Sequence, residues 1–384
     1  MREIQAILSA YEVLKKQGQP CVLATVLHVE GSSYRQAGAR MLVAEDGHIT
    51  GAISGGCLEG DALKKALLAL RQGQNKLLTY DTNDEEDAIV GAQLGCNGVI
   101  QVLLEPIRPD QPENPLELLR RLADQEEVLA VATVFNMDKQ QPQPGTSAVF
   151  DREMNLRGRI ADETMLRAVQ ADVFQGFETQ GSQVCEYHIA GKAQQVLIEI
   201  CLPPPHLVLV GAGNDAWPPA QMAALLGWKV TVADGRPTHA NSRRFAGGCQ
   251  VIVSKPESLL DSLRIHSRTA FVLMTHNYPY DLAVFRLLLQ HPDIAYIGIL
   301  GPRKKYLRML DDLSREGIRL SPEQEARVFA PVGLDLGAEN AAEIGLAVLA
   351  EIQAVLNGTS GAHLRERTGP IHDTAQQALQ IRNL

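Results

Sequence analysis

The alternation of apolar and polar residues changes character near residue 206. From there onward, short apolar runs bounded by turn residues alternate with segments of helical periodicity. Strands that alternate with helices predict a parallel sheet with crossover helices, which is a doubly wound α/β architecture. The predicted strands are residues 206–210, 229–233, 250–253, 270–275, 295–299 and 328–330, and the predicted helices are residues 216–226, 281–289, 304–313 and 338–356.

The N-terminal half of the chain repeats its apolar pattern. Residues 21–43 match residues 128–150 in the order of their apolar positions, and residues 99–107 match residues 193–201. Such self-similarity predicts two copies of one α/β unit. The first eighteen residues add an amphipathic helix in front of the first copy.

Two proline-rich segments, residues 106–115 and 202–206, separate the parts of the chain. Prolines disfavour both helices and central strands, and we expect these segments to act as semi-rigid spacers. We expect a homodimer, in which the spacers set the first domain against the doubly wound domain of the same chain or of the partner chain, so that two domains close over the binding site. We interpret the polar tail as a mobile segment or an interface arm. The predicted parts are an α/β domain over residues 1–108, a degenerate second copy over residues 116–201, the doubly wound domain over residues 206–358 and the tail over residues 359–384.

Composition narrows the classes of function. The chain has 384 residues, a formal net charge of -9 and 45% hydrophobic residues, which fits a globular protein of two or three domains. Without a long basic run, this charge argues against nucleic acid as a partner. No apolar run reaches the roughly eighteen residues of a membrane span, and the cysteines lack the spacing of a structural zinc site. We therefore expect a cytoplasmic protein that binds neither nucleic acid nor membranes.

A glycine-cysteine turn in the first copy is the first candidate site. Gly55, Gly56 and Cys57 stand at the start of a predicted helix over residues 58–70, and we expect Cys57 to lie at the first turn of this helix. Glycines let the backbone bend and present its N–H groups, which together with the helix dipole favour an anion or a thiolate. The alternative is that Cys57 is a small buried residue that fills the angle between helix and strand.

Three further residues of the first copy are candidates. Cys96 has Gly95 before it and Asn97-Gly98 after it, and Arg35 and Arg40 lie on either side of Gly38. The arginines either direct a guanidinium at a phosphate or simply project from strand edges. Because the second copy has no counterpart of either glycine-cysteine loop, we predict that the first copy is the functional half.

A glycine-rich turn after the first strand of the doubly wound domain is the second candidate site. Gly211 and Gly213 end this strand, Ala216 takes the third position of the dinucleotide fingerprint, and Asp234 ends the next strand. This pattern predicts a phosphate at the helix N-terminus and a ribose hydroxyl on Asp234. The alternative is a tight turn of a Rossmann-like sheet that takes another ligand or none.

Other residues just past the strand ends should face the same crevice, and they include Arg236, His276 and Arg303. Arg303 opens a helix together with Lys304 and Lys305, where cations and free backbone donors can meet phosphate; a solvated face is the alternative. His276 is either functional or a polar strand cap. The chain has no Ser-His-Asp order, HExxH motif or Walker A lysine, so nothing supports a hydrolase or an ATPase.

Seven segments taken together resemble the XdhC/CoxI family of accessory factors for xanthine dehydrogenase and related molybdenum hydroxylases. The likeness covers the first copy to about residue 106 and most of residues 206–358. Three places depart from the family pattern. Asn214 follows Gly-Ala-Gly where family members usually have histidine, Cys96-Asn97-Gly98 stands where they often have Cys-Gly-Gly, and Pro302 stands where they have serine. The segments are GSSYRQAGARMLV (31–43), DGHITGAISGGCLEG (46–60), LVLVGAGN (207–214), VADGR (232–236), LMTHNYPYD (273–281), YIGILGPRKK (296–305) and PVGLDLGAENAAEIGLAVLAEI (331–352).

The resemblance implies a role in handling a cofactor. Family members bind molybdenum cofactor (molybdopterin), protect it, help it to acquire its terminal sulfido ligand and hand it to the apo-enzyme. The implied partners are a xanthine dehydrogenase-type molybdenum hydroxylase and, for sulfuration, a cysteine desulfurase. On this resemblance Cys57 contacts the cofactor and ligates its metal, while the phosphate or nucleotide of the cofactor suits a glycine-rich anion site. An NAD(P)-dependent oxidoreductase is the alternative, but the lack of an obvious proton relay favours a non-catalytic chaperone.

Overall fold

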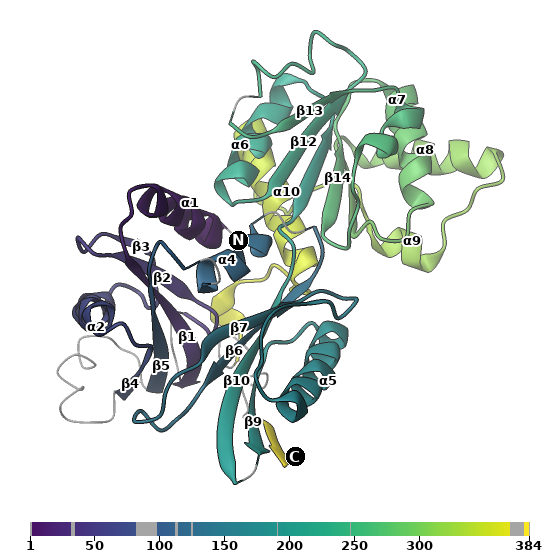
Figure 1. Cartoon of the computed structure of the whole chain (residues 1–384). Helices are drawn as coiled ribbons and strands as arrows, with labels where there is room; N and C mark the ends of the chain where they lie inside the picture. The colour runs from purple at the N-terminus through teal and green to yellow at the C-terminus, as the bar shows by residue number, and fades with distance from the viewer. Residues whose placement is uncertain are drawn as a thin grey trace. The chain divides into compact units, whose positions relative to one another are not determined.

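The computed structural model describes residues 2–31, 35–81, 98–111, 114–123, 126–189, 191–245, 247–368 and 380–383. The chain divides into two compact units (Figure 1). The N-terminal unit consists of Met1–Pro203 together with Thr368–Leu384, and the C-terminal unit consists of Pro204–Arg367.

The first sheet of the N-terminal unit has five antiparallel strands in the order β3-β2-β1-β5-β4. Helix α2 (Glu59–Gln72) covers one face of this sheet, because Ala62, Ala66 and Ala69 form a buried stripe along it. Helix α1 (Arg2–Lys16) precedes the sheet in the chain. The strands are β1 (Cys21–Gly31), β2 (Arg40–Ala44), β3 (Ile49–Gly51), β4 (Lys76–Asp81) and β5 (Gly98–Ile107).

The second sheet of the N-terminal unit has the order β8-β7-β6-β10-β9-β17. Strands β6 to β10 repeat the arrangement of the first sheet. Helix α5 (Glu163–Thr179) lies between β8 and β9 in the chain, as α2 lies between β3 and β4. The short helix α4 (Pro115–Leu119) precedes β6. The strands are β6 (Leu129–Phe135), β7 (Gly145–Phe150), β8 (Leu156–Gly158), β9 (Gln183–Ile189), β10 (Lys192–Cys201) and β17 (Gln380–Asn383).

Strand β17 comes from the tail of the chain and pairs in parallel with β9. The sequence pattern does not predict this strand, because Gln380, Arg382 and Asn383 are polar and only Ile381 is apolar. The unpaired edge of β9 supplies the backbone donors and acceptors that order it.

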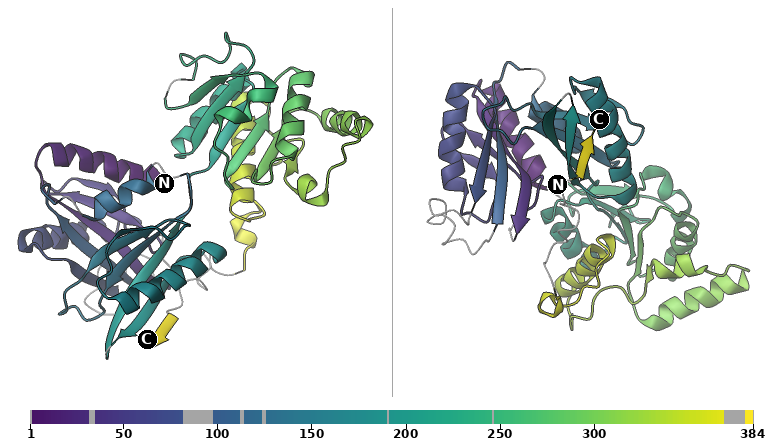
Figure 2. Two further views of the ribbon diagram at one scale, coloured as in Figure 1. Left: turned by 45° about the vertical axis from the view of Figure 1, so that its right-hand side comes forward. Right: turned by 90° about the horizontal axis from the view of Figure 1, so that it is seen from below.

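The two sheets of the N-terminal unit pack against each other. Successive side chains of a strand point to opposite faces, so Val22 and Ala24 of β1 pack with α2, whereas Leu27 packs with Phe135 of the second sheet. Burial on both faces explains why β1 is an almost continuous apolar run. Helices α2 and α5 lie on the outer faces (right-hand view of Figure 2).

The sheet of the C-terminal unit is parallel, in the order β13-β12-β11-β14-β15-β16. Helices α6 (Trp217–Leu225) and α10 (Ala341–Leu356) pack on one face, and α7 (Tyr278–Leu289) and α8 (Arg303–Arg315) on the other. This confirms the predicted Rossmann-like, doubly wound sheet. The strands are β11 (His206–Val210), β12 (Lys229–Asp234), β13 (Gln250–Val253), β14 (Thr269–Leu273), β15 (Tyr296–Ile299) and β16 (Val328–Phe329).

Capping residues explain where the helices of this unit begin. The periodicity predicts a helix from residue 338, but α10 starts at Ala341 because Asn340 caps it and Glu343 completes a capping box. In the same way, the side chain of Asn277 accepts the N–H of Tyr280 and starts α7 three residues before the predicted helix.

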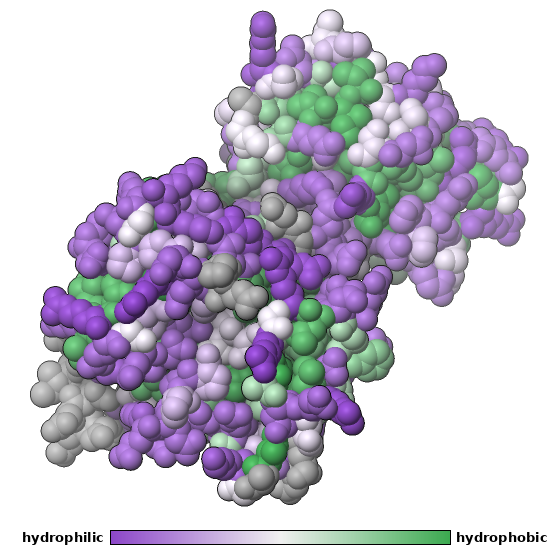
Figure 3. Space-filling model, in the orientation of Figure 1, coloured by the Kyte–Doolittle hydropathy of each residue, from purple (hydrophilic) through white to green (hydrophobic). Residues whose placement is uncertain are grey.

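The surface is mostly hydrophilic in the view of Figure 3, where apolar side chains form separate patches. Within the described residues, no helix combines the length and the apolar character that crossing a membrane requires.

Candidate functional site

A serine hydroxyl organises the turn that carries Cys57. The Oγ of Ser54 accepts the backbone N–H groups of Gly56, Cys57 and Leu58 at 3.3, 3.1 and 3.1 Å. Gly56 has a φ of +107°, which disfavours any residue with a Cβ atom. The N–H groups that the sequence assigned to an anion are therefore bound by the protein itself.

Glu59, the first residue of α2, closes the turn from the other side. Its carboxylate accepts the backbone N–H of Ser54 at 2.8 Å and the hydroxyl of Ser54 at 2.5 Å. Partial burial raises the pKa of Glu59, but the hydrogen bonds from Ser54 outweigh this and hold the pKa below its usual value. The ionised carboxylate also lies where the helix dipole stabilises negative charge. Sequence reasoning missed Ser54 and Glu59, because they are five positions apart and do not have the S-x-x-E spacing of a capping box.

Cys57 is exposed and lies two residues before α2 begins at Glu59, rather than in its first turn. Of the other described cysteines, Cys21 and Cys185 are buried, and Cys201 and Cys249 are half-buried. Burial raises the pKa of the Cys21 thiol to about 12, which makes it an inert residue of the core. The exposed position of Cys57 argues against its being a core filler.

The structure places the two arginine candidates of the first copy differently. Arg35 forms a bidentate ion pair with Glu3 of α1 at 3.1 and 3.2 Å, and Glu3 also accepts the N–H of Ala52, two residues before Ser54. Arg40 is buried and pairs with Glu199 of β10 at 2.5 and 3.0 Å. Arg35 is therefore close in the structure to the Cys57 turn, whereas Arg40 is directed at the second sheet.

Cys96, the second glycine-flanked cysteine, lies outside the described residues. Its assignment to the cofactor site stays a prediction.

The glycine-rich turn of the C-terminal unit has two different glycines. Gly211 has a φ of +124°, and a Cβ atom there would lie 2.7 Å from the carbonyl oxygen of Met274, so the fold itself requires glycine. Gly213 caps the 3-10 turn Asn214–Ala216, and a Cβ atom there would meet nothing within 4 Å. The open space beside Gly213 leaves room for a ligand against the backbone.

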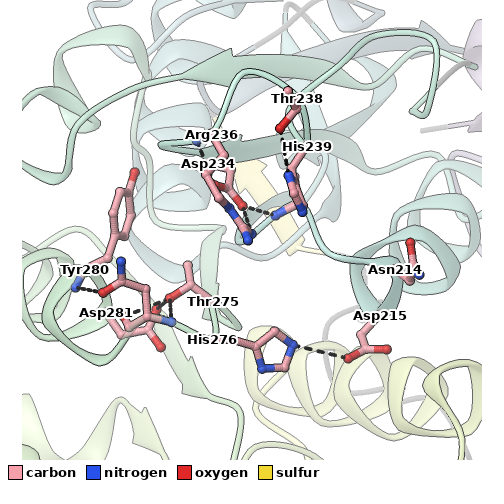
Figure 4. A network of polar contacts seen from close by, with 12 residues as sticks. Asn214, Asp215, Asp234, Arg236, Thr238, His239, Thr275, His276, Tyr280 and Asp281 are labelled. Atoms are coloured by element: carbon pink, nitrogen blue, oxygen red, sulfur yellow. Dashed lines mark hydrogen bonds and ion pairs between the residues drawn. The ribbon is translucent and has the colours of Figure 1, made fainter.

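Asp234, at the end of β12, is buried and engaged on both carboxylate oxygens. One oxygen accepts the N–H of Ala212 at 2.8 Å, and the guanidinium of Arg236 binds both oxygens at 2.8 and 2.9 Å (Figure 4). Burial raises the pKa of Asp234, but these hydrogen bonds hold it below the usual value. In this structure the carboxylate binds the glycine turn and Arg236, so a ribose hydroxyl would have to displace one of them.

A second arginine, which sequence reasoning missed, fixes the same turn. Arg244 donates to the carbonyl of Ala212 at 2.9 Å and to the side chain of Asn214 at 2.9 Å. Asn214 is the position where the family pattern usually has histidine. Arg244 is 32 and 30 positions away from Ala212 and Asn214, and no local pattern identifies such contacts.

His276 and Arg303 both stay accessible at the carboxyl edge of the sheet. The imidazole of His276 is exposed and lies 3.9 Å from the carboxylate of Asp215 (Figure 4). Arg303 is exposed at the start of α8. Lys305 instead pairs with the buried Asp281 at 2.6 Å, so it is a structural cation rather than a free phosphate ligand.

Two family models match the chain. The model of the XdhC and CoxI family matches residues 14–81, which include the Cys57 turn. The model of the XdhC Rossmann domain matches residues 207–352.

Relatives match along most of the chain. A Bacillus subtilis (strain 168) protein, named as a probable xanthine dehydrogenase subunit, is 31% identical over 341 residues, which are 89% of this chain and 94% of that protein. The molybdenum cofactor insertion chaperone PaoD of Escherichia coli (strain K12) is 25% identical over 338 residues, which are 88% of this chain and 84% of that protein. A Bacillus halodurans protein, whose solved structure is described as a xanthine dehydrogenase, gives a TM-score of 0.72 at 26% identity over 93% of this chain and 98% of that one.

The fold and its sites define a two-unit α/β protein in which a thiol-bearing turn on one unit accompanies a Rossmann domain on the other. The matches agree with this class along nearly the whole length. The chain belongs to the XdhC and CoxI family, as the sequence motifs predict.

Proposed function

We propose that the protein is an accessory factor that binds molybdenum cofactor, protects it, assists its sulfuration and inserts it into a xanthine dehydrogenase-type molybdenum hydroxylase. The similarity to PaoD supports the insertion role, and the similarity to a probable xanthine dehydrogenase subunit supports the class of client enzyme. The structural observation that carries the proposal is the exposed thiol of Cys57 on a preorganised turn.

A single exposed thiol suits a carrier better than a closed metal site does. Within the described ranges, no cluster of three or more His, Cys, Asp or Glu side chains could hold a metal by itself. Cys57 would therefore add one protein ligand to the molybdenum, which the rest of the cofactor already holds. Such a contact is strong enough to retain the cofactor and simple enough to exchange when the client enzyme takes over.

Arg35 is the candidate cation for the phosphate of the cofactor. Its present partner, Glu3, is a half-exposed carboxylate that an anion could replace, because exposed ion pairs contribute little stability. We assign no role in cofactor binding to Arg40, since removing it from Glu199 would leave a carboxylate unpaired between the sheets.

The Rossmann unit is the candidate site for a nucleotide or a phosphate. Gly213 and Arg236 favour a phosphate group, because an arginine beside the acidic residue of this fold is suited to a phosphorylated ribose. The alternative of an NAD(P)-dependent oxidoreductase rests on the same residues, together with His276 and Arg303. A homodimer and a cysteine desulfurase partner complete the proposal as expectations of the family resemblance.

The test is the retention of the cofactor by the full-length protein. We expect Cys57→Ser, purified without oxygen from cells that make molybdenum cofactor, to retain several-fold less molybdenum and pterin than the wild type. Its unfolding midpoint should stay unchanged, because an exposed thiol contributes little to packing.

Cys249→Ser is the matched control. Cys249 is a half-buried thiol of the C-terminal unit, so its substitution tests whether the loss of any accessible thiol has the same effect. Equal metal and pterin contents in the wild type and Cys57→Ser would contradict the assignment of Cys57.

A further inference from the structure

Two glutamates occupy matching places in the two sheets of the N-terminal unit. Glu105 lies on β5 and pairs with Leu23 of β1, and Glu199 lies on β10 and pairs with Val131 of β6. Each carboxylate crosses to the other sheet and lies against a glycine. A Cβ atom on Gly38 would lie 2.7 Å from the carboxylate of Glu199, and one on Gly145 would lie 2.3 Å from that of Glu105.

The residue two positions after each glycine differs. Arg40 donates to the carbonyl of Gly38 at 3.0 Å, and Ser147 donates to the carbonyl of Gly145 at 2.8 Å, so the two side chains occupy equivalent positions. Arg40 extends further and also binds Glu199 through both of its terminal nitrogens. The short side chain of Ser147 leaves the carboxylate on its side without an equivalent cation.

Among the described residues, the hydrogen bonds to the Glu105 carboxylate come from one neutral residue. The carboxylate accepts the backbone N–H of Thr146 at 2.7 Å and its hydroxyl at 2.8 Å. Burial raises the pKa of Glu105 to about 7, although both hydrogen bonds and the nearby charge of Arg40 oppose the rise. A carboxylate has about four acceptor positions, so Thr146 does not saturate it.

Glu105 and Ser147, the counterpart of Arg40, both line a cavity of about 610 Å³. Its lining includes Glu105, Thr146, Ser147 and Asn75. The volume lies within the range of small-molecule sites, which is about 300 to 1,000 Å³.

Two arginines supply positive charge to the same cavity. Arg157 and Arg159 line it and are both exposed; Arg157 lies in β8 and Arg159 directly follows that strand. The other acids of the lining are engaged, since Asp162 caps α5 and Glu117 binds Lys15 and Arg120.

We propose that this cavity binds a phosphorylated heterocycle that presents two adjacent N–H donors to Glu105 and its phosphate to Arg157 and Arg159. A guanidinium satisfies the equivalent carboxylate in the first copy, and the 2-amino-4-oxopyrimidine edge carries the same pair of N–H donors in a plane. Guanine nucleotides and phosphorylated pterins share this edge.

The site is separate from the Cys57 turn and does not depend on the proposed function. Cys57 precedes α2 and Asn75 follows it, and the fourteen residues of that helix extend about 20 Å. A ligand in the cavity thus leaves Cys57 free, and either proposal can fail while the other stands.

The test is a titration of the full-length protein with neopterin phosphate, GMP, CMP and inorganic phosphate. We expect neopterin phosphate, GMP or both to bind saturably, and the tighter of the two identifies the source of the ligand. CMP should bind about tenfold more weakly or not at all, because cytosine has an acceptor where the second donor is needed.

Two variants test the carboxylate and the space beside it. Glu105→Gln removes the charged acceptor and should weaken binding about tenfold or more. Ser147→Arg restores the arginine of the first copy, and it should abolish binding by filling the cavity and pairing with Glu105. Ser9→Arg adds the same charge on an exposed position of α1 and should leave the affinity unchanged.

Three results would overturn the proposal. They are the absence of saturable binding to the wild type, equal affinities for GMP, neopterin phosphate and CMP, and unchanged affinity in both Glu105→Gln and Ser147→Arg. If Ser147→Arg does not fold, an unchanged affinity in Glu105→Gln alone would overturn the proposal.

Discussion

The two sheets of the N-terminal unit share one strand order but treat their buried carboxylates differently. Glu199 has a charged partner in Arg40, whereas Glu105 has the backbone and hydroxyl of Thr146. The apolar strands therefore maintain the same framework in both sheets. Single polar residues decide whether a buried carboxylate is neutralised by a cation, or has a shifted pKa and acceptor positions that a ligand can use.

The outer edges of the two sheets show a second difference of this kind. In the first sheet, Tyr80 donates to Asp61, and Lys65 of the same helix pairs with that aspartate at 2.8 Å. In the second sheet, Tyr187 donates to Asp172, and the cation is Arg382, which β17 brings from the end of the chain at 2.8 Å. The tail thus supplies a charge that the first sheet obtains locally.

The largest expected effect follows from the pairing of Arg40 with Glu199. We predict that Arg40→Met destabilises the protein by about 3 kcal/mol or more, because it leaves a carboxylate unpaired between the sheets. Urea unfolding measures this change. Arg35→Met is the control, since its exposed ion pair with Glu3 should contribute about 0.5 kcal/mol.

A double variant sharpens this prediction. Adding Glu199→Gln to Arg40→Met should recover part of the lost stability, because the amide does not need a cation. Equal unfolding free energies for the Arg40 and Arg35 variants would show that the pair between the sheets is no more important than a surface pair.

Glu105 predicts a dependence of stability on pH. Its pKa of about 7 lies above the usual 4.5, so between these values the folded protein holds a proton that the unfolded chain has released. Stability should therefore fall by about 3 kcal/mol as pH rises from about 4.5 to 7, and stay level above that. Unfolding of the wild type and Glu105→Gln across this range measures the effect as the difference between the two. A difference that does not change with pH would mean that Glu105 is ionised throughout.

Much of the fold could be predicted from the sequence, because its signals are local. Short apolar runs and helical periodicity identify the parallel sheet, and the glycines around Cys57 identify a turn before α2. Helix starts at Asn277 and Asn340 depend on a single capping side chain, and the periodicity misplaces them by a few residues.

The contacts that complete the sites depend on pairs far apart in the chain. Arg40 and Glu199 are separated by 159 positions, and Arg382 and Asp172 by 210. Nothing near either residue indicates its partner. The role of Ser54 was missed for another reason, because three N–H groups converge on its hydroxyl only once the glycine turn has formed.

The smallest expected effect compares the two cations at the sheet edges. Asp172 is only 7% exposed, whereas Asp61 is 37% exposed, so the aspartate of the second sheet depends more on its partner. We predict that Arg382→Ala costs about 1 kcal/mol, since the arginine itself is partly exposed and solvent screens the pair. Lys65→Ala should cost about 0.3 kcal/mol, which is typical of an exposed pair on one helix.

Chemical unfolding of both variants at low and at 1 M salt measures the two costs, and the larger cost should persist at high salt because the buried carboxylate is screened less. Equal costs would mean that β17 contributes no charge that the second sheet needs, and the tail would then be held by its backbone pairing with β9 alone.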